Sequence, residues 1–172
     1  LSEILLMCLI CNLKATSLMP KLISLLFTIV LFSLSYKGFA QSPETPVTAL
    51  FNAMRAHDGE QLAAQFTNGA LLQRAEPGGN IKSNDISQFA GFVTQSDKYL
   101  DEKLLAIIVQ QSDNLAAVWT PYVFYLDGEL SHCGVNSFQL VKVGPSWKIQ
   151  YLIDNMHSGD CALFIKQYSA DE

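Results

Sequence analysis

Alternating apolar and polar residues fill the chain from Asp113 to Asn155 and predict three consecutive β-strands. The Asp127-Gly128 dipeptide separates two of these runs. It is a strong hairpin signal, because both residue types accept the backbone conformation of a two-residue turn. Gly144-Pro145-Ser146 supplies a second turn directly before Trp147. The pattern therefore predicts a curved antiparallel sheet at the centre of the fold.

Helical spacing dominates the part of the chain before this sheet. Thr45 as cap and Pro46 in the first turn start a helix whose apolar positions are Val47, Leu50, Phe51 and Met54. Asp58 is placed to cap a short second helix over 60–66, and a third helix starts at 83–85. Short strands are predicted at 70–74, near Ile81 and at 104–110.

This order of elements predicts an α+β domain in which three helices cover one side of a bent antiparallel sheet. We expect four parts along the chain. They are a leader and signal peptide at 1–40, a linker at 41–46, the folded domain at 47–156 and a C-terminal tail at 157–172.

The segment from Met19 to Ala40 has the three parts of a secretory signal peptide. It has a basic start, an apolar run at 22–34, and small residues at Gly38 and Ala40. The apolar run is shorter than the roughly 20 residues that span a bilayer. We therefore predict cleavage after Ala40 and a periplasmic or secreted protein, with residues 1–18 as an over-long gene start.

Net charge indicates which partners are excluded, and the cysteines indicate a disulfide. Residues 41–172 hold eight Lys and Arg and fifteen Asp and Glu, a net charge of −7. Such an acidic domain is a poor partner for nucleic acid or an anionic membrane surface. Cys133 and Cys161, 28 positions apart, are predicted to form a disulfide in an oxidising compartment. Two unpaired thiols are the alternative.

Two stretches carry a resemblance to a known family. VTALFNAMRAHDGEQLAAQF at 47–66, HCGVNSFQLVKVGPSWKI at 132–149 and the strand order between them resemble the nuclear transport factor 2-like superfamily. More narrowly, they resemble its small bacterial SnoaL-like and lumazine-binding groups. The resemblance implies a cone-shaped half-barrel with a cavity between sheet and helices, and dimers through the outer sheet face. Members include ketosteroid isomerases, dehydratases, polyketide cyclases and domains without known catalysis, so the fold does not choose the activity.

Strand alternation then assigns side chains to the two faces of the sheet. If both hairpins are regular, the ligand pocket is lined by Thr120, Tyr122, Phe124, Ser137, Trp147, Tyr151, Asn155 and His157. The outer face carries Trp119, Phe138, Leu140 and Leu152, which we predict to form a homodimer surface. Gly134 leaves one alternative open. A bulge there would turn His132 inward and Cys133 outward.

Candidate chemistry is sparse. His157 and His132 are weak candidates for a general base, and we assign no catalytic residue. The histidines at 57, 132 and 157 lack ligand spacing, so neither a metal nor a cofactor is expected. The sequence favours an exported domain that binds a small hydrophobic or aromatic molecule. The alternatives are an isomerase-, dehydratase- or cyclase-like enzyme with a pocket histidine as base, and an interaction module using the outer sheet face.

Overall fold

The computed structural model describes residues 41–169, and the predicted signal peptide lies outside them. The helices in this range are α3 (Glu44–Arg55), α4 (Gly59–Ala63), α5 (Ile86–Gln95) and α6 (Cys161–Ser169). The strands are β1 (Phe66–Ala75), β2 (Ile81–Asn84), β3 (Leu100–Leu104), β4 (Ile108–Ser112), β5 (Leu115–Leu126), β6 (Glu129–Val143) and β7 (Ser146–Met156).

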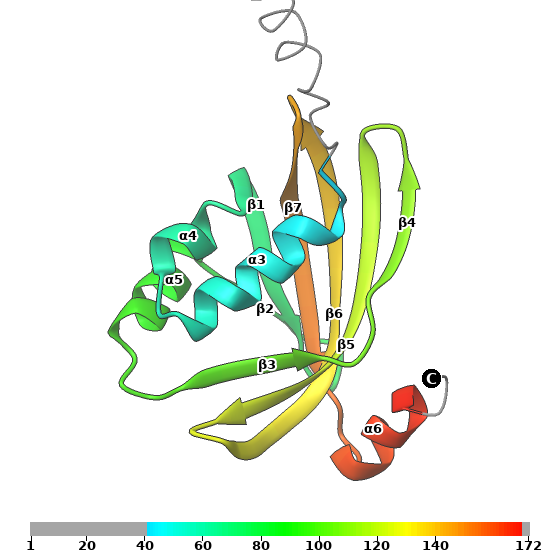
Figure 1. Cartoon of the computed structure of the whole chain (residues 1–172). Coiled ribbons are helices and arrows are strands. Elements are labelled where there is room, and N and C mark those ends of the chain that lie inside the picture. Colours follow the sequence, from blue (N-terminus) through cyan, green and yellow to red (C-terminus); the bar gives the residue numbers. More distant parts are fainter. Residues whose placement is uncertain (1–40, 170–172) are drawn as a thin grey trace, which may run out of the picture. The chain divides into compact units, whose positions relative to one another are not determined.

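The strands form one sheet in the order β2-β1-β7-β6-β5-β3, and β4 pairs with β5 beside β3. All pairs are antiparallel except β1 with β7. Helix α3 crosses one face of the curved sheet, and α4 and α5 lie beside it (Figure 1). The predicted α+β class, with helices covering one side of a bent sheet, is confirmed.

Two of the three predicted helix starts follow the expected capping chemistry. Asp58 caps α4 by accepting a hydrogen bond from the Gln61 N–H at 2.9 Å, and Asp85 caps α5 through the Gln88 N–H at 2.9 Å. Helix α3 begins one residue before the predicted cap Thr45, and no side chain caps it. Its predicted apolar positions are all buried against the sheet.

The single strand predicted at 104–110 is wrong. The chain instead forms β3 and β4, which pair with different parts of β5. Between them, three residues at 105–107 lie opposite two residues at 120–121. Pro121 has no N–H to donate to the sheet, so the regular ladder cannot continue through this point. The predicted tail at 157–172 also contains a helix, α6.

The hairpin between β5 and β6 has the predicted two-residue turn. Leu126 pairs with Glu129, and Asp127 and Gly128 both have positive φ, 51° and 84°. The register then changes, because Tyr125 pairs with Leu130 but Phe124 pairs with His132, which leaves Ser131 as an extra residue. This bulge exchanges the two faces of β6 relative to a regular hairpin.

A second extra residue, Gln150, lies in β7, because Leu140 pairs with Ile149 and Gln139 with Tyr151. It reverses the facing of the second half of β7. Together the two bulges turn Phe138, Leu140 and Leu152 toward the helices. Their exposed fractions are 0%, 0% and 5%, and the ring centroids of Phe138 and Phe51 of α3 lie 6.3 Å apart.

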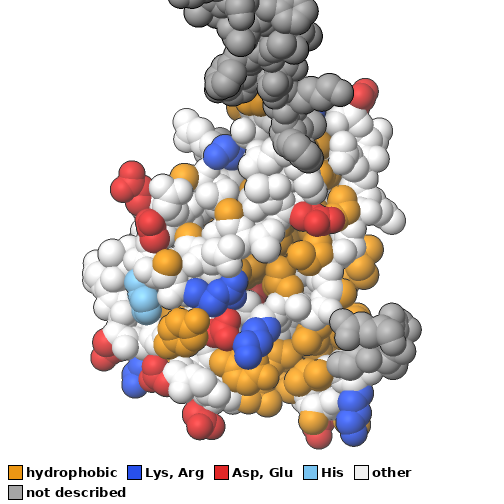
Figure 2. Space-filling model, viewed as in Figure 1, with side chains coloured by type: hydrophobic (Ala, Val, Ile, Leu, Met, Phe, Trp, Pro, Cys, Tyr) orange, Lys and Arg blue, Asp and Glu red, His pale blue; other side chains and the backbone are white. Residues whose placement is uncertain are grey.

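The prediction that Phe138, Leu140 and Leu152 lie on the outer face is therefore wrong. Of the four residues, only Trp119 is on the surface, with 47% of its area exposed. It lies across from Ile108 of β4 and Ser137 of β6. On the side that Figure 2 shows, apolar side chains gather between α3 and β4 and again below β3. A homodimer stays a prediction, without the surface that was expected to form it.

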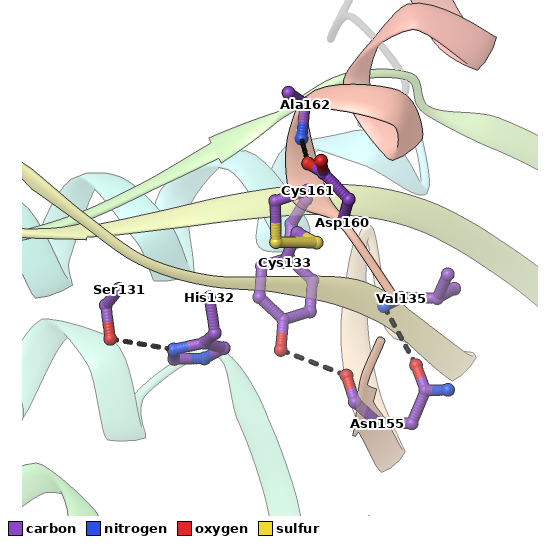
Figure 3. Close-up of a disulfide and its surroundings, with 9 residues drawn as sticks. Ser131, His132, Cys133, Val135, Asn155, Asp160, Cys161 and Ala162 are labelled. Atoms are coloured by element: carbon purple, nitrogen blue, oxygen red, sulfur yellow. Dashed lines mark hydrogen bonds between the residues drawn. A yellow bond between two sulfur atoms is a disulfide. The ribbon is translucent and has the colours of Figure 1, made fainter. Parts of the chain in front are cut away.

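The predicted disulfide is confirmed. Cys133 of β6 and Cys161 at the start of α6 are bonded, with their Cα atoms 5.7 Å apart. Helix α6 packs its buried Phe164 against Val123 and Cys133, on the sheet face opposite α3. Figure 3 shows His132 and the disulfide on opposite sides of β6. The orientation left open is thus settled, with His132 inward and Cys133 outward, but the bulge is at Ser131 and Gly134 pairs regularly with Tyr122.

Candidate functional site

A cavity of about 170 Å³ lies between the helices and the concave face of the sheet. We call it the central cavity. Its apolar wall is formed by Leu50, Phe51 and Met54 of α3, Phe89 and Phe92 of α5, and Leu72, Leu100, Phe124 and Leu152 of the sheet. Its polar wall is formed by Arg74, Asn84, Glu102, His132, Asn136 and Asp154.

A row of polar residues crosses the sheet beneath this cavity. Thr120 of β5 pairs with Asn136 of β6, Asn136 pairs with Asp154 of β7, and Asp154 pairs with Arg74 of β1. Residues that lie directly opposite one another in paired strands point to the same face. Four neighbouring strands therefore each contribute one polar side chain to the otherwise apolar inner face.

Glu102 of β3 contacts this row of polar residues at Asn136. Its Oε1 accepts a hydrogen bond of 2.7 Å from the Asn136 amide nitrogen, which also donates to the Thr120 hydroxyl at 3.2 Å. Arg55 at the end of α3 holds β3 in place, because its Nη1 donates to the Glu102 carbonyl oxygen at 3.0 Å and to Asp101 at 3.2 Å. Asn136 thus holds the carboxyl group of Glu102, and Arg55 holds the backbone that carries it.

Burial raises the pKa of Glu102 from 4.5 to about 8. The Asn136 hydrogen bond and the charges of Arg74 and Arg55 lower this pKa, and the charge of Asp154 raises it, but burial is the largest cause. The residue as a whole is only partly buried, and Glu102 lines the cavity. At neutral pH most of this carboxyl is therefore protonated and can donate a hydrogen bond into the cavity.

Arg74 and Asp154 form a fork-to-carboxylate ion pair. Nε of Arg74 donates to both carboxylate oxygens, at 3.0 and 2.9 Å, and Nη2 donates to Oδ2. The hydrogen bond to Asp154 raises the pKa of Arg74. Within residues 41–169, the hydrogen-bond partner of the third nitrogen, Nη1, is the Met156 sulfur at 3.8 Å. This nitrogen keeps donor capacity for another group.

His132 faces the cavity beside two aromatic rings. Its ring centroid lies 5.1 Å from that of Phe124 and 5.8 Å from that of Tyr122. Burial lowers the pKa of His132 below 6.5, the charge of Arg74 lowers it further, and the charge of Asp154 acts in the opposite direction. The imidazole is therefore mainly neutral at pH 7, with one nitrogen able to accept a proton.

Comparison with known proteins gives a match in structure alone. No family model matches the chain, and no curated protein matches its sequence. A proposed scytalone dehydratase from Novosphingobium aromaticivorans aligns with a TM-score of 0.55 at 15% identity, covering 66% of this chain and 80% of that one. A proposed dehydratase of the NTF2-like family from Streptomyces avermitilis gives 0.56 at 17%, covering 67% and 93%. A proposed aromatic ring hydroxylase from N. aromaticivorans gives 0.57 at 15%, covering 67% and 87%.

The chain has the nuclear transport factor 2-like (NTF2-like) fold. The resemblance carried by 47–66 and 132–149 is thus confirmed at the level of fold, and at these identities the likeness extends no further. Activity in this NTF2-like domain must be argued from its own cavity.

Of the eight residues predicted to line the pocket, the central cavity includes Phe124. Thr120 lies beneath the cavity wall, bonded to Asn136, and Trp147 is 2% exposed within the apolar core. Ser137 lies across from Trp119 on the opposite face. The assignment of Ser137 to the pocket was wrong because the bulge at Ser131 turns it to the other face. The assignment of Trp147 was wrong because its side chain is buried in the apolar core and does not reach the cavity.

The remaining four predicted residues make structural contacts. The Tyr122 hydroxyl donates to the Asn155 carbonyl oxygen at 3.1 Å, and burial raises its pKa. Asn155 Oδ1 accepts from the Val135 N–H at 3.0 Å, and the Tyr151 hydroxyl donates to Gln73 at 2.8 Å. His157 packs on Phe164 with ring centroids 4.8 Å apart. It is not among the residues that line the central cavity.

Gly134 is required for the approach of β6 to β7 at this point. A Cβ atom added there would overlap the Asn155 carbonyl oxygen and lie 2.9 Å from the Tyr122 hydroxyl. A residue with a side chain would therefore push apart the strands that carry His132 and Asp154.

Sequence reasoning missed Glu102, Arg74 and Asp154, although each carries a readable signal. Each lies two residues from an apolar residue that faces the core, so its own side chain is expected to face the core as well. Leu100-x-Glu102-x-Leu104 is an example. A charged residue at such a position is expensive to bury and is therefore a candidate for function.

Metal-ligand groups and membrane-spanning helices are both absent from the described residues. From 41 to 169, no three His, Cys, Asp or Glu side chains are grouped so that they could hold a metal ion. In the same range, no helix combines the length and the apolar character needed to cross a bilayer.

Proposed function

We propose that this NTF2-like domain binds a small molecule in the central cavity, and that the molecule has an apolar body with at least one hydrogen-bonding group. The observation that carries the proposal is a cavity with an apolar roof over a fixed polar group, Glu102 with Asn136. Ligand sites are typically apolar with a few well-placed polar groups.

The volume and the lining residues of the central cavity favour a ligand with a single ring. An engineered apolar cavity of about 150 Å³ in another protein accepts benzene, and the central cavity here is about 170 Å³. Phe51, Phe89, Phe92, Phe124 and His132 contribute five aromatic rings to its wall. Aromatic rings pack favourably edge-to-face or offset against one another, so an aromatic ligand is preferred over an aliphatic one of equal size.

The proposal includes an exported location. It is supported by the signal-peptide pattern at Met19–Ala40 and by the bond between Cys133 and Cys161. Disulfides persist mainly in oxidising compartments.

A thermal-shift screen of the purified protein with monocyclic phenols and aryl ketones tests this function. A ligand at 100 times its Kd should stabilise the fold by about 2.7 kcal/mol. Met54→Trp, which places an indole in the cavity, should abolish the shift, and Leu163→Trp on the exposed face of α6 should preserve it. If Met54→Trp does not fold, Asn84→Trp at the exposed rim replaces it. A panel without any stabilising compound, or binding that survives both cavity-filling variants, would refute the proposal.

A second candidate function is proton-transfer catalysis, favoured by a protonated acid and a neutral base that face one cavity. Glu102 pairs with Phe124 and Phe124 pairs with His132, so acid and base lie two strand spacings apart, about 10 Å between Cα atoms. The Phe124 side chain lies between them on the same face, so a substrate ring would lie over Phe124 to reach both. His132 would take a proton from a carbon beside a carbonyl, and Glu102 would give its proton to a departing hydroxyl.

Dehydration of 3-hydroxycyclohexanone to cyclohexenone and water, followed by the ultraviolet absorbance of the enone, tests this second candidate. We expect Glu102→Gln and His132→Gln each to lower the rate at least about 100-fold. His157→Gln, in a histidine that packs on Phe164, is the matched control and should keep the rate. Equal rates in all three variants would exclude these two residues as acid and base.

A further inference from the structure

Two hollows adjoin the central cavity and extend the space for a ligand beyond one ring. The first, of about 300 Å³, lies at the β1–β2 hairpin and shares Arg74 and Asn84 with the cavity. The second, of about 450 Å³, lies between the end of α5 and β3 and shares Phe92 and Leu100 with the cavity. A ligand with its ring in the cavity can therefore extend a tail into either hollow.

The two hollows differ in charge. Arg74 and Lys82 line the β1–β2 hollow together with one acidic residue, Glu76. The α5–β3 hollow contains Asp97 and Lys98, and Lys98 is paired with Asp127 at 2.8 Å. Residues 41–172 carry a net charge of −7, so a hollow with two of the eight cationic side chains stands out.

The two cations of the β1–β2 hollow are neighbours. Arg74 and Lys82 pair directly across β1 and β2. Directly opposite side chains have their Cβ atoms about 5 Å apart, and like charges in such positions weaken a sheet. Asp154 engages Nε and Nη2 of Arg74, whereas Nη1 keeps donor capacity. Among residues 41–169, Lys82 forms no ion pair.

We infer that the ligand of the central cavity carries an acidic group on a short tail, and that this group binds between Arg74 and Lys82 in the β1–β2 hollow. The inference rests on the proposed function, since the ring must first occupy the cavity. An anion placed there would pair with Lys82, whose charge has no partner among residues 41–169, and would accept a hydrogen bond from Nη1 of Arg74, whose charge already pairs with Asp154. Asn84, two residues from Lys82 on the same face of β2, continues the polar path from the hollow into the cavity.

A length series of phenylalkanoates against matched phenylalkanols tests the inference by calorimetric titration. Phenylacetate, 3-phenylpropionate and 4-phenylbutyrate place a carboxylate at increasing distance from the ring. At the best length the acid should bind about 10-fold tighter than its alcohol. Lys82→Gln should remove most of that preference without changing the affinity for the alcohol. Lys142→Gln, on β6 and outside this hollow, is the matched control and should change neither affinity.

The outcomes separate the two proposals. Alcohols that bind as tightly as the acids, or an acid preference that Lys82→Gln leaves intact, would overturn the inference while the cavity remains a binding site. Failure of every acid and alcohol, together with failure of the uncharged phenols above, would overturn the proposed function itself.

Discussion

Raising the pH from 5 to 9 should lower the free energy of unfolding of the wild-type domain, relative to that of Glu102→Gln, by on the order of 3 to 5 kcal/mol. Burial raises the pKa of Glu102 from 4.5 to about 8, so the folded state holds this proton more tightly than the unfolded chain does. The stabilisation is therefore fully present below pH 4.5. It declines as the pH rises toward 8 and is lost above that pH.

The comparison with Glu102→Gln isolates this group from others that titrate in the same range. The lowered pKa of His132 acts in the opposite direction, because its contribution is present above pH 6.5 and lost as the pH falls. Glutamine keeps the size of the side chain and an oxygen that can accept from Asn136. The difference between the two proteins therefore reports the carboxyl proton alone.

Urea unfolding of both proteins at pH 5, 6, 7, 8 and 9 measures the effect. Glu129→Gln removes a carboxyl group at an exposed position of the β5–β6 hairpin and is the matched control. Its stability should stay parallel to that of the wild type across this range. If the wild type and Glu102→Gln also remained parallel, the carboxyl of Glu102 would be ionised in the folded protein, and its role as a proton donor in the cavity would be excluded.

Loss of the disulfide should lower the free energy of unfolding by about 3 to 4 kcal/mol, because a bond that encloses 28 residues restricts the unfolded chain. For a domain of this size the melting temperature should fall by roughly 10 to 20 °C. The bond joins β6 to α6, and Phe164 of α6 covers Val123 and Cys133 on the sheet. Helix α6 should therefore become the part of the domain that opens most readily.

Melting curves of the wild type and Cys161→Ala, each with and without dithiothreitol, measure this effect. The reductant should bring the wild type down to the level of Cys161→Ala and leave that variant unchanged. Cys161→Ala is preferred over Cys133→Ala, because Cys133 is fully buried and its truncation would add a packing defect. A melting temperature that is the same with and without reductant in the wild type would show that the bond does not hold α6 in place.

The sequence indicated the fold, but it did not show which polar residues meet in the cavity. Glu102, Asn136, Asp154 and Arg74 belong to four different strands, and their meeting depends on register. A single extra residue in a strand moves every following side chain to the other face. The extra Ser131 therefore placed Asn136 in the cavity, where a regular β5–β6 hairpin would have placed Val135 and Ser137, and the extra Gln150 keeps Asp154 on the same face as Asn136.

Local chemistry in the sequence was sufficient for several features. Asp58 and Asp85 specify helix starts through their own side chains, and Asp127-Gly128 specifies a turn through its backbone preference. Helical spacing in α3 likewise specified the buried face. Such features depend on residues within one turn of each other, so neighbours in sequence are enough to determine them.

The amino-acid sequence by itself determined the class of the fold, the caps of α4 and α5, the β5–β6 hairpin and the pairing of Cys133 with Cys161. Only the tertiary structure decided which face of β6 and β7 lines the cavity, and that Glu102 lies beside Asn136. The physical reason is that a bulge costs little locally but inverts a whole strand. Its position is chosen by the packing of the entire sheet against α3 and α5.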